Sequence, residues 1–177
     1  RVHRAPPLDR KSRISAVLKA PGDFRFTVVI AAMLVIGQVW RKRESWWRPA
    51  VVLLLSGMLS GLLYTLVKWS AGRGRPFKGH EAFEFRPFAN GLSGLIHAES
   101  NLAFPSGHAC LAFATAAAVG VILPRWRWAF LVGAMLVGAQ RVLDGSHYPS
   151  DVAAGAALGL LSAWTVAAVV GRRKGLA

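Results

Sequence analysis

The sequence predicts an all-α fold, a polytopic membrane bundle of about five transmembrane helices. First, the 177 residues are 54% hydrophobic yet carry a formal net charge of +14, which is typical of a membrane protein with basic loops. Second, five apolar runs without charge follow one another along the chain. Third, tryptophans stand at the run ends, where aromatic belts lie in membrane proteins. These are Trp40, Trp46, Trp47, Trp69, Trp126 and Trp128.

A basic leader, residues 1–25, precedes the first run and carries seven Lys and Arg residues. Its apolar side chains fall loosely on one helical face. Two interpretations stay open: an amphipathic helix lying on anionic lipid, or a flexible basic segment.

The five uncharged runs are residues 26–40, 50–67, 109–123, 128–140 and 152–171. A spanning helix needs roughly 20 residues, with a lower limit near 17. The second and fifth runs meet this limit alone, and the others reach it only with flanking residues. The last run has no polar face, which argues against a soluble bundle. We expect one membrane domain over 26–171, with close helix packing at Gly57 and Gly61 and at Gly155 and Gly159.

Alternating crossings would bring the unusual polar residues to one side of the membrane. These are Lys68, residues 105–108, Arg141 and Asp151. The other side receives the basic loops and the basic tail 172–177, so by the positive-inside rule it is cytoplasmic. The polar cluster then faces the periplasm, or its equivalent, of a bacterial inner membrane. Five spans would also put the basic leader outside. Either a further helix precedes it in the complete protein, or the leader lies flat on the outer leaflet.

The stretch QRVLDGSHYPSD, residues 140–151, holds Arg141, His147 and Asp151 in the pattern R-x5-H-x3-D. A helix beginning near Tyr148 would put Asp151 in its first turn, where the carboxylate can turn back toward the imidazole. A carboxylate on one ring nitrogen fixes the tautomer and leaves the other nitrogen as a base or nucleophile. Taken alone, such a pair is more often a local hydrogen bond.

Two further motifs are expected on the same side. Lys68 and Arg75 form K-x6-R-P, in which cations flank glycines that let the backbone curl around an anion. The sequence P-S-G-H opens the third run. Ser106 suits a helix N-cap, Gly107 allows close approach of a ligand, and His108 is placed to donate a proton. Taken singly, these motifs also suit an ordinary interfacial lysine and an ordinary capped helix.

Together the three motifs resemble the signature of the type 2 phosphatidic acid phosphatases, the PAP2 superfamily, over residues 50–170. One departure is Gln140 in front of Arg141, where the family usually has serine. The resemblance implies that His147 is the nucleophile and forms a phosphohistidine, that Asp151 orients it, and that His108 protonates the leaving oxygen and then activates water. The implied phosphate ligands are Lys68, Arg75, Ser106, Gly107 and Arg141.

The resemblance implies a lipid phosphatase without cofactor or metal. Candidate substrates are polyprenyl diphosphate, phosphatidylglycerol phosphate, phosphatidate and lipid A phosphate. Two alternatives stay open: a phosphotransferase, and a non-catalytic membrane protein that binds anionic lipid. Nucleic acid is not an expected partner, because the basic residues form no basic helix face. No obligate protein partner is inferred, and the single Cys110 excludes an internal disulfide.

The loop over residues 77–104 is too apolar for a simple linker and is predicted to be a lid, a lipid entry surface or a cap on the helix ends. Arg73, Lys78 and Arg86 are expected to add positive charge there that attracts an anionic headgroup. The remaining histidines match no motif and are interpreted as loop or surface residues. They are His3, His80 and His97.

Overall fold

The computed structural model describes residues 17, 19–42, 46–76, 84–88, 91 and 102–171. Most of the predicted leader, most of the 77–104 loop and the 172–177 tail lie outside the described residues. So do Lys78 and the three histidines that match no motif. The predictions made for those parts of the chain therefore stay predictions.

The described residues form helices and no strand beyond two isolated bridges, which confirms the all-α class. The helices are α2 (Phe24–Trp40), α3 (Arg48–Ala71), α5 (Gly107–Ile122), α6 (Arg127–Leu143) and α7 (Pro149–Gly171). Short 3₁₀ turns are η1 (Ala20–Gly22) and η3 (Pro124–Trp126). Each predicted apolar run coincides with one α-helix to within a few residues.

Two of these helices are long and apolar enough to cross a membrane, α3 and α7 up to Val170. The helices α2 and α5 are apolar but shorter. Many large apolar side chains point outward from the bundle, among them Met33, Met58 and Val169. Most of the tryptophans predicted for aromatic belts are exposed as well, including Trp40 and Trp128. This surface suits lipid, while the number of crossings stays a prediction.

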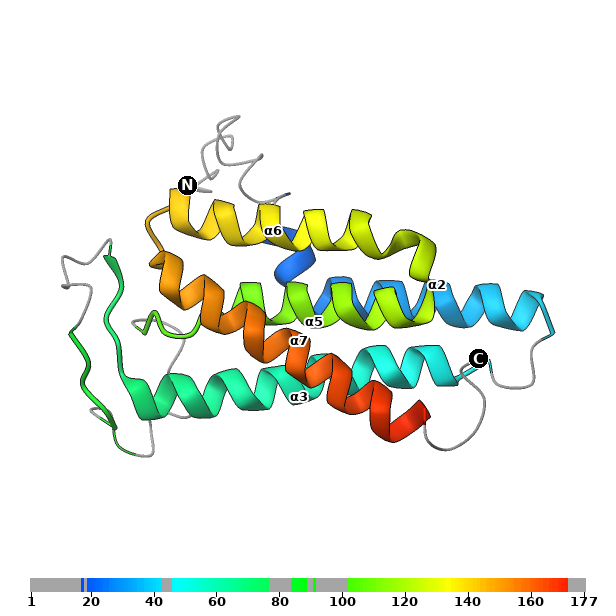
Figure 1. Ribbon diagram of the computed structural model, residues 1–177, viewed down its shortest axis with the longest axis horizontal. Helices are drawn as coiled ribbons and strands as arrows, with labels where there is room; N and C mark the ends of the chain where they lie inside the picture. The colour runs from blue at the N-terminus through cyan, green and yellow to red at the C-terminus, as the bar shows by residue number, and fades with distance from the viewer. Residues whose placement is uncertain are drawn as a thin grey trace, which may run out of the picture.

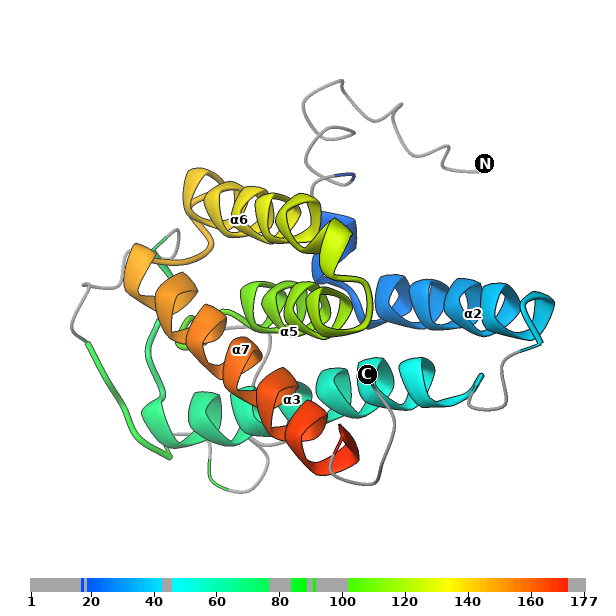
Figure 2. The same cartoon turned by 45° about the vertical axis from the view of Figure 1, so that its right-hand side comes forward.

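Helix α5 lies at the centre of the bundle, packed against α3, α6 and α7, while α2 packs against α3 (Figures 1 and 2). The buried face of α5 is rich in alanine, which lets neighbouring helices approach closely. At Gly159, an added Cβ would lie 2.1 Å from the carbonyl oxygen of Cys110, and at Gly155 it would lie 2.5 Å from that of Ser106. The predicted close packing is therefore present at this pair. At Gly57 an added Cβ would meet Phe24, but at Gly61 it would meet nothing within 4 Å.

The end of α3, the start of α5, the end of α6 and the start of α7 lie at the same end of the bundle (Figure 1). This is the arrangement that alternation predicted for the polar motifs. Gly72 ends α3 in the left-handed conformation, with φ of 64°. A Cβ there would lie 1.8 Å from the carbonyl oxygen of Arg86, so only glycine fits this turn. The turn directs residues 73–75 across the helix ends.

Candidate active site

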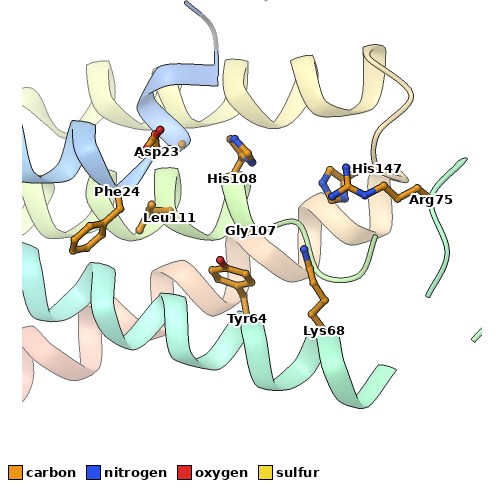
Figure 3. A pocket seen from close by; sticks show the side chains of 10 residues that line it. Asp23, Phe24, Tyr64, Lys68, Arg75, Gly107, His108, Leu111 and His147 are labelled. Carbon is orange, nitrogen blue, oxygen red and sulfur yellow. The ribbon is translucent and has the colours of Figure 1, made fainter. Parts of the chain in front are cut away.

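A cavity of about 320 Å³ opens between the end of α3, the starts of α2 and α5, and the loop before α7 (Figure 3). Five of the eight predicted site residues line it: Lys68, Arg75, Gly107, His108 and His147. The other wall residues are Gly22, Asp23, Phe24, Tyr64 and Leu111. The remaining three predicted residues are buried and bonded to segments that reach the cavity: Ser106, Arg141 and Asp151.

Two cations reach into the cavity from different segments. Lys68 is only 3% exposed, and its ammonium lies 5.4 Å from the ring centroid of Tyr64. Arg75 donates from Nε to the carbonyl oxygen of Leu102 at 3.2 Å. In Figure 3 both side chains extend toward the space beside His147. Two cations that line one cavity attract an anion to this part of it.

The first turn of α5 forms another wall. The Ser106 hydroxyl caps the helix and accepts from the backbone N–H of Ala109 at 3.5 Å, and Gly107 and His108 begin the helix. An added Cβ at Gly107 would lie 3.1 Å from Tyr64. Glycine therefore keeps the helix close to α3 and leaves its terminal N–H groups near the cavity. A helix N-terminus at this position adds partial positive charge.

His147 is 3% exposed, and its backbone N–H donates to the carbonyl oxygen of Arg141 at 3.2 Å. Its Nδ1 lies 2.8 Å from the carbonyl oxygen of Ala103. A carbonyl oxygen only accepts, so the hydrogen-bond partner assigns the proton to Nδ1 and leaves Nε2 unprotonated. Asp151 Oδ2 lies 3.7 Å from Nδ1, which is beyond hydrogen-bond length. Ala103, which the motifs did not indicate, therefore shares in orienting the ring.

Burial lowers the pKa of His147 from its ordinary range, and the nearby Asp151 carboxylate opposes this effect. Three cations lower that pKa further, namely Lys68, Arg75 and Arg141. The ring is therefore biased toward its neutral form, which is the form that can act as a nucleophile.

Asp151 lies in the first turn of α7, as predicted, and it is fully buried. Oδ2 accepts from the backbone N–H of Tyr148 at 2.8 Å, and Oδ1 accepts from Nη1 of Arg73. The same Arg73 nitrogen donates to the Ser150 hydroxyl at 2.8 Å. The expectation that Arg73 adds surface charge to the loop is wrong, because the side chain is buried and its charge is matched by Asp151. The sequence feature that could have indicated a buried role for Arg73 is its position between Gly72 and Gly74 of the first motif.

Asp144, also missed from the sequence, lies in the turn after α6. It accepts from the Ser146 hydroxyl at 3.1 Å and forms ion pairs with Arg141 and Lys19. Partial burial alone would raise the pKa of Asp144, but the hydrogen bonds from Lys19 and Ser146 and the charges of Lys19 and Arg141 outweigh this and lower it.

The end of the predicted leader packs on the bundle next to the site. A Cβ added at Gly22 would lie 2.8 Å from the carbonyl oxygen of His108, so η1 lies directly against the start of α5. Among the residues that the structure describes, no three His, Cys, Asp or Glu side chains gather as a metal-binding group.

Comparison with known proteins gives a family and close relatives. A family model described as the PAP2 superfamily matches residues 45–174. The lipid A 1-phosphatase of Rhizobium johnstonii is 43% identical over 128 residues, which cover 70% of this chain and 48% of the relative. The undecaprenyl-diphosphatase of Sulfolobus acidocaldarius is 29% identical over 133 residues, 75% of this chain and 57% of the relative. The chain thus spans about half the length of these curated relatives.

A solved structure shares the fold. It is the transmembrane PAP2 type phosphatidylglycerolphosphate phosphatase of Bacillus subtilis, with a TM-score of 0.68 and 24% identity. The match covers 98% of this chain and 81% of that chain. At this identity the likeness concerns the fold alone.

Proposed function

This chain belongs to the PAP2 superfamily, and we propose that it is a membrane lipid phosphatase that hydrolyses a phosphomonoester or diphosphate on a lipid. The observation that carries the proposal is the pairing of two histidines on one cationic cavity. His147 turns Nδ1 to a carbonyl oxygen, and His108 stands in the first turn of α5 across the same space. Binding an anionic lipid without chemistry would need the cations but no such nucleophile.

In the first step Nε2 of His147 attacks phosphorus. A P–N bond forms, the bond from phosphorus to the lipid oxygen breaks, and protonated His108 gives its proton to that oxygen. Nδ1 keeps its proton on the carbonyl oxygen of Ala103. The phosphorylated ring is then cationic, and the Asp151 carboxylate at 3.7 Å from Nδ1 stabilises it.

In the second step neutral His108 takes a proton from water as the water oxygen attacks phosphorus. The P–N bond breaks, phosphate leaves, and both histidines return to their starting protonation states. Phosphoryl transfer depends mainly on placing charge around three equatorial oxygens. Lys68, Arg75 and Gly107 line the cavity, and we assign the two cations and the amide of Gly107 to this role. We assign Arg141 and Ser106 to the same phosphate, as the family resemblance implies.

The relatives support two lipid substrates. The 43% identity to a lipid A 1-phosphatase puts a lipid A phosphate first, and the similarity to an undecaprenyl-diphosphatase puts a polyprenyl diphosphate second. We place the site on the outer face of a bacterial inner membrane. No metal or cofactor enters either step.

The test is phosphate release by the purified protein in detergent, with a panel of four lipids: lipid A, polyprenyl diphosphate, phosphatidylglycerol phosphate and phosphatidate. The His147→Ala variant is the control for contaminating phosphatase. Release from one lipid by the wild type only is expected. Transfer of phosphate to a lipid or sugar acceptor without release would favour the phosphotransferase alternative. Lipid binding without either reaction would contradict enzymatic function.

A further inference from the structure

We propose that Arg73 is a positioning residue for His147, acting through a closed ring of contacts that includes Ala103 and Asp151. The inference rests on the proposed role of His147 as nucleophile. The proposed role of Arg73 differs from that of Lys68 and Arg75. These two residues come from the same motif region but line the cavity.

The main-chain contacts between Arg73 and Ala103 determine which acceptor Nδ1 of His147 meets. The backbone N–H of Ala103 donates to the carbonyl oxygen of Arg73 at 2.7 Å, and the carbonyl oxygen of Ala103 lies 2.8 Å from Nδ1 of His147. Ala103 is fully buried. The path of the chain at Arg73 therefore fixes the acceptor that holds the Nδ1 proton.

The side-chain half holds the carboxylate. Nη1 of Arg73 bonds both Oδ1 of Asp151 and the Ser150 hydroxyl at the start of α7. The guanidinium also lies 4.2 Å from the ring centroid of Tyr148 and 5.3 Å from that of Phe85. With side-chain exposures of 4% for Arg73 and 0% for Asp151, solvent does not screen this ion pair. The pair fixes where the carboxylate stands relative to Nδ1.

The charge of Arg73 also decides which group Asp151 pairs with. A buried carboxylate without its cation favours proton uptake by a nearby group, and Nδ1 of His147 lies 3.7 Å from Oδ2 of Asp151. With Arg73 present, the guanidinium shares the charge of the Asp151 carboxylate, so the carboxylate attracts a proton at His147 less strongly. Other charged or titratable groups also lie around His147. They are Asp23 in front of α2, Tyr64 and Lys68 on α3, Arg75 after α3, His108 on α5 and Arg141 on α6.

The experiment compares pH profiles of kcat/KM for lipid phosphate in wild type, Arg73→Gln and Arg73→Lys. Removing the cation should move the acid limb of Arg73→Gln upward by about 1–3 pH units, so that much of the activity lost at neutral pH returns at high pH. Arg73→Lys keeps the charge and should show the smaller shift. Arg125→Gln, an exposed arginine at the opposite end of the bundle, is the matched control and should keep the wild-type profile.

A second comparison covers the case in which Arg73→Gln does not fold. Asp151→Asn leaves the charge of Arg73 beside His147 and should move the acid limb below that of wild type. The double variant Arg73→Gln/Asp151→Asn has neither charge, so the acid limb of its pH profile should lie at a higher pH than that of Asp151→Asn. A merely structural role would lower activity at every pH without moving the limbs.

The two proposals fail in different ways. A wild type that releases no phosphate from any lipid of the panel would overturn the proposed function and this inference with it. An active wild type whose Arg73→Gln variant keeps the wild-type acid limb would overturn the inference alone. Equal limbs in Asp151→Asn and the double variant would do the same.

Discussion

Nδ1 of His147 lies 2.8 Å from the carbonyl oxygen of Ala103. Because the carbonyl can only accept, this contact selects one tautomer and leaves Nε2 unprotonated, as the proposed nucleophile requires. A backbone carbonyl does not titrate, so this selection holds at every pH at which the ring is neutral. The nearby carboxylate of Asp151 is then available to stabilise charge on the ring.

The pH dependence of activity follows from the environment of His147. Burial lowers its pKa below the ordinary value of 6.5, Asp151 opposes this, and the cations lower it further. A depressed pKa keeps the ring neutral at lower pH, so the proposed nucleophile should stay competent below pH 6.5. We predict that the acid limb of kcat/KM, which reports the free enzyme, lies below pH 6.5. An acid limb at or above pH 7 would contradict the depressed pKa.

The second prediction concerns helix packing. Gly159→Ala places a methyl group against the backbone of α5 and should destabilise the bundle by about 1–3 kcal/mol, the usual cost of overpacking. Gly61→Ala is the matched control on α3, where the added methyl group meets nothing within 4 Å. It should be neutral or stabilising, because alanine favours helix more than glycine does. Thermal unfolding in detergent measures both. Equal melting temperatures for the two variants would disprove the close α5–α7 contact.

The helices and half of the ten residues that line the cavity could be predicted from the sequence because both signals are local. Uncharged runs locate the helices, and three short motifs locate Lys68, His108 and His147. The Arg73–Asp151 pair joins residues 78 positions apart, and nothing in either segment marks the other as its partner. Ala103 was also out of reach, since it acts through a backbone carbonyl that every residue possesses. The Lys19–Asp144 ion pair likewise depends on how the leader folds back.

The third prediction concerns sidedness. A reporter fused after Gly171 should be cytoplasmic, and one inserted near Gly91 should lie outside, because the basic residues gather on the loops at the other end of the bundle. Alkaline phosphatase and green fluorescent protein fusions at both positions report opposite sides. The reverse pattern would place the cavity in the cytoplasm and remove outer-leaflet lipids as substrates.

The fourth prediction concerns metal. Activity should survive EDTA, because side-chain cations supply the charge around the phosphate in the proposed mechanism. Vanadate should inhibit, because it mimics the transferring phosphoryl group. Phosphate release is measured after chelation and again after adding magnesium. Complete loss with EDTA that only magnesium restores would point to another mechanism.

The last prediction distinguishes the proposed roles of the two histidines that line the cavity. His147 is assigned the attack on phosphorus, and His108 the protonation of the leaving oxygen. His147→Ala removes the atom that we propose attacks phosphorus, so no leaving group should restore turnover. His108→Ala removes the proton donor, and general acid catalysis is worth about 10²–10⁴-fold for a poor leaving group. A nitrophenolate leaves without a proton. Nitrophenyl phosphate, if it is turned over by the wild type, should therefore recover part of the loss in His108→Ala and none in His147→Ala.

Asp151→Asn should fall between the two histidine variants. It keeps the shape of the side chain but no longer supplies the negative charge that stabilises the phosphorylated ring. Phosphate release by the three variants is compared with a lipid phosphate and with the activated ester. Rapid quenching of the wild type should also trap an acid-labile, base-stable phosphoryl group that His147→Ala lacks. Near-normal turnover by His147→Ala, or rescue of that variant by the activated ester, would mean that another group attacks phosphorus.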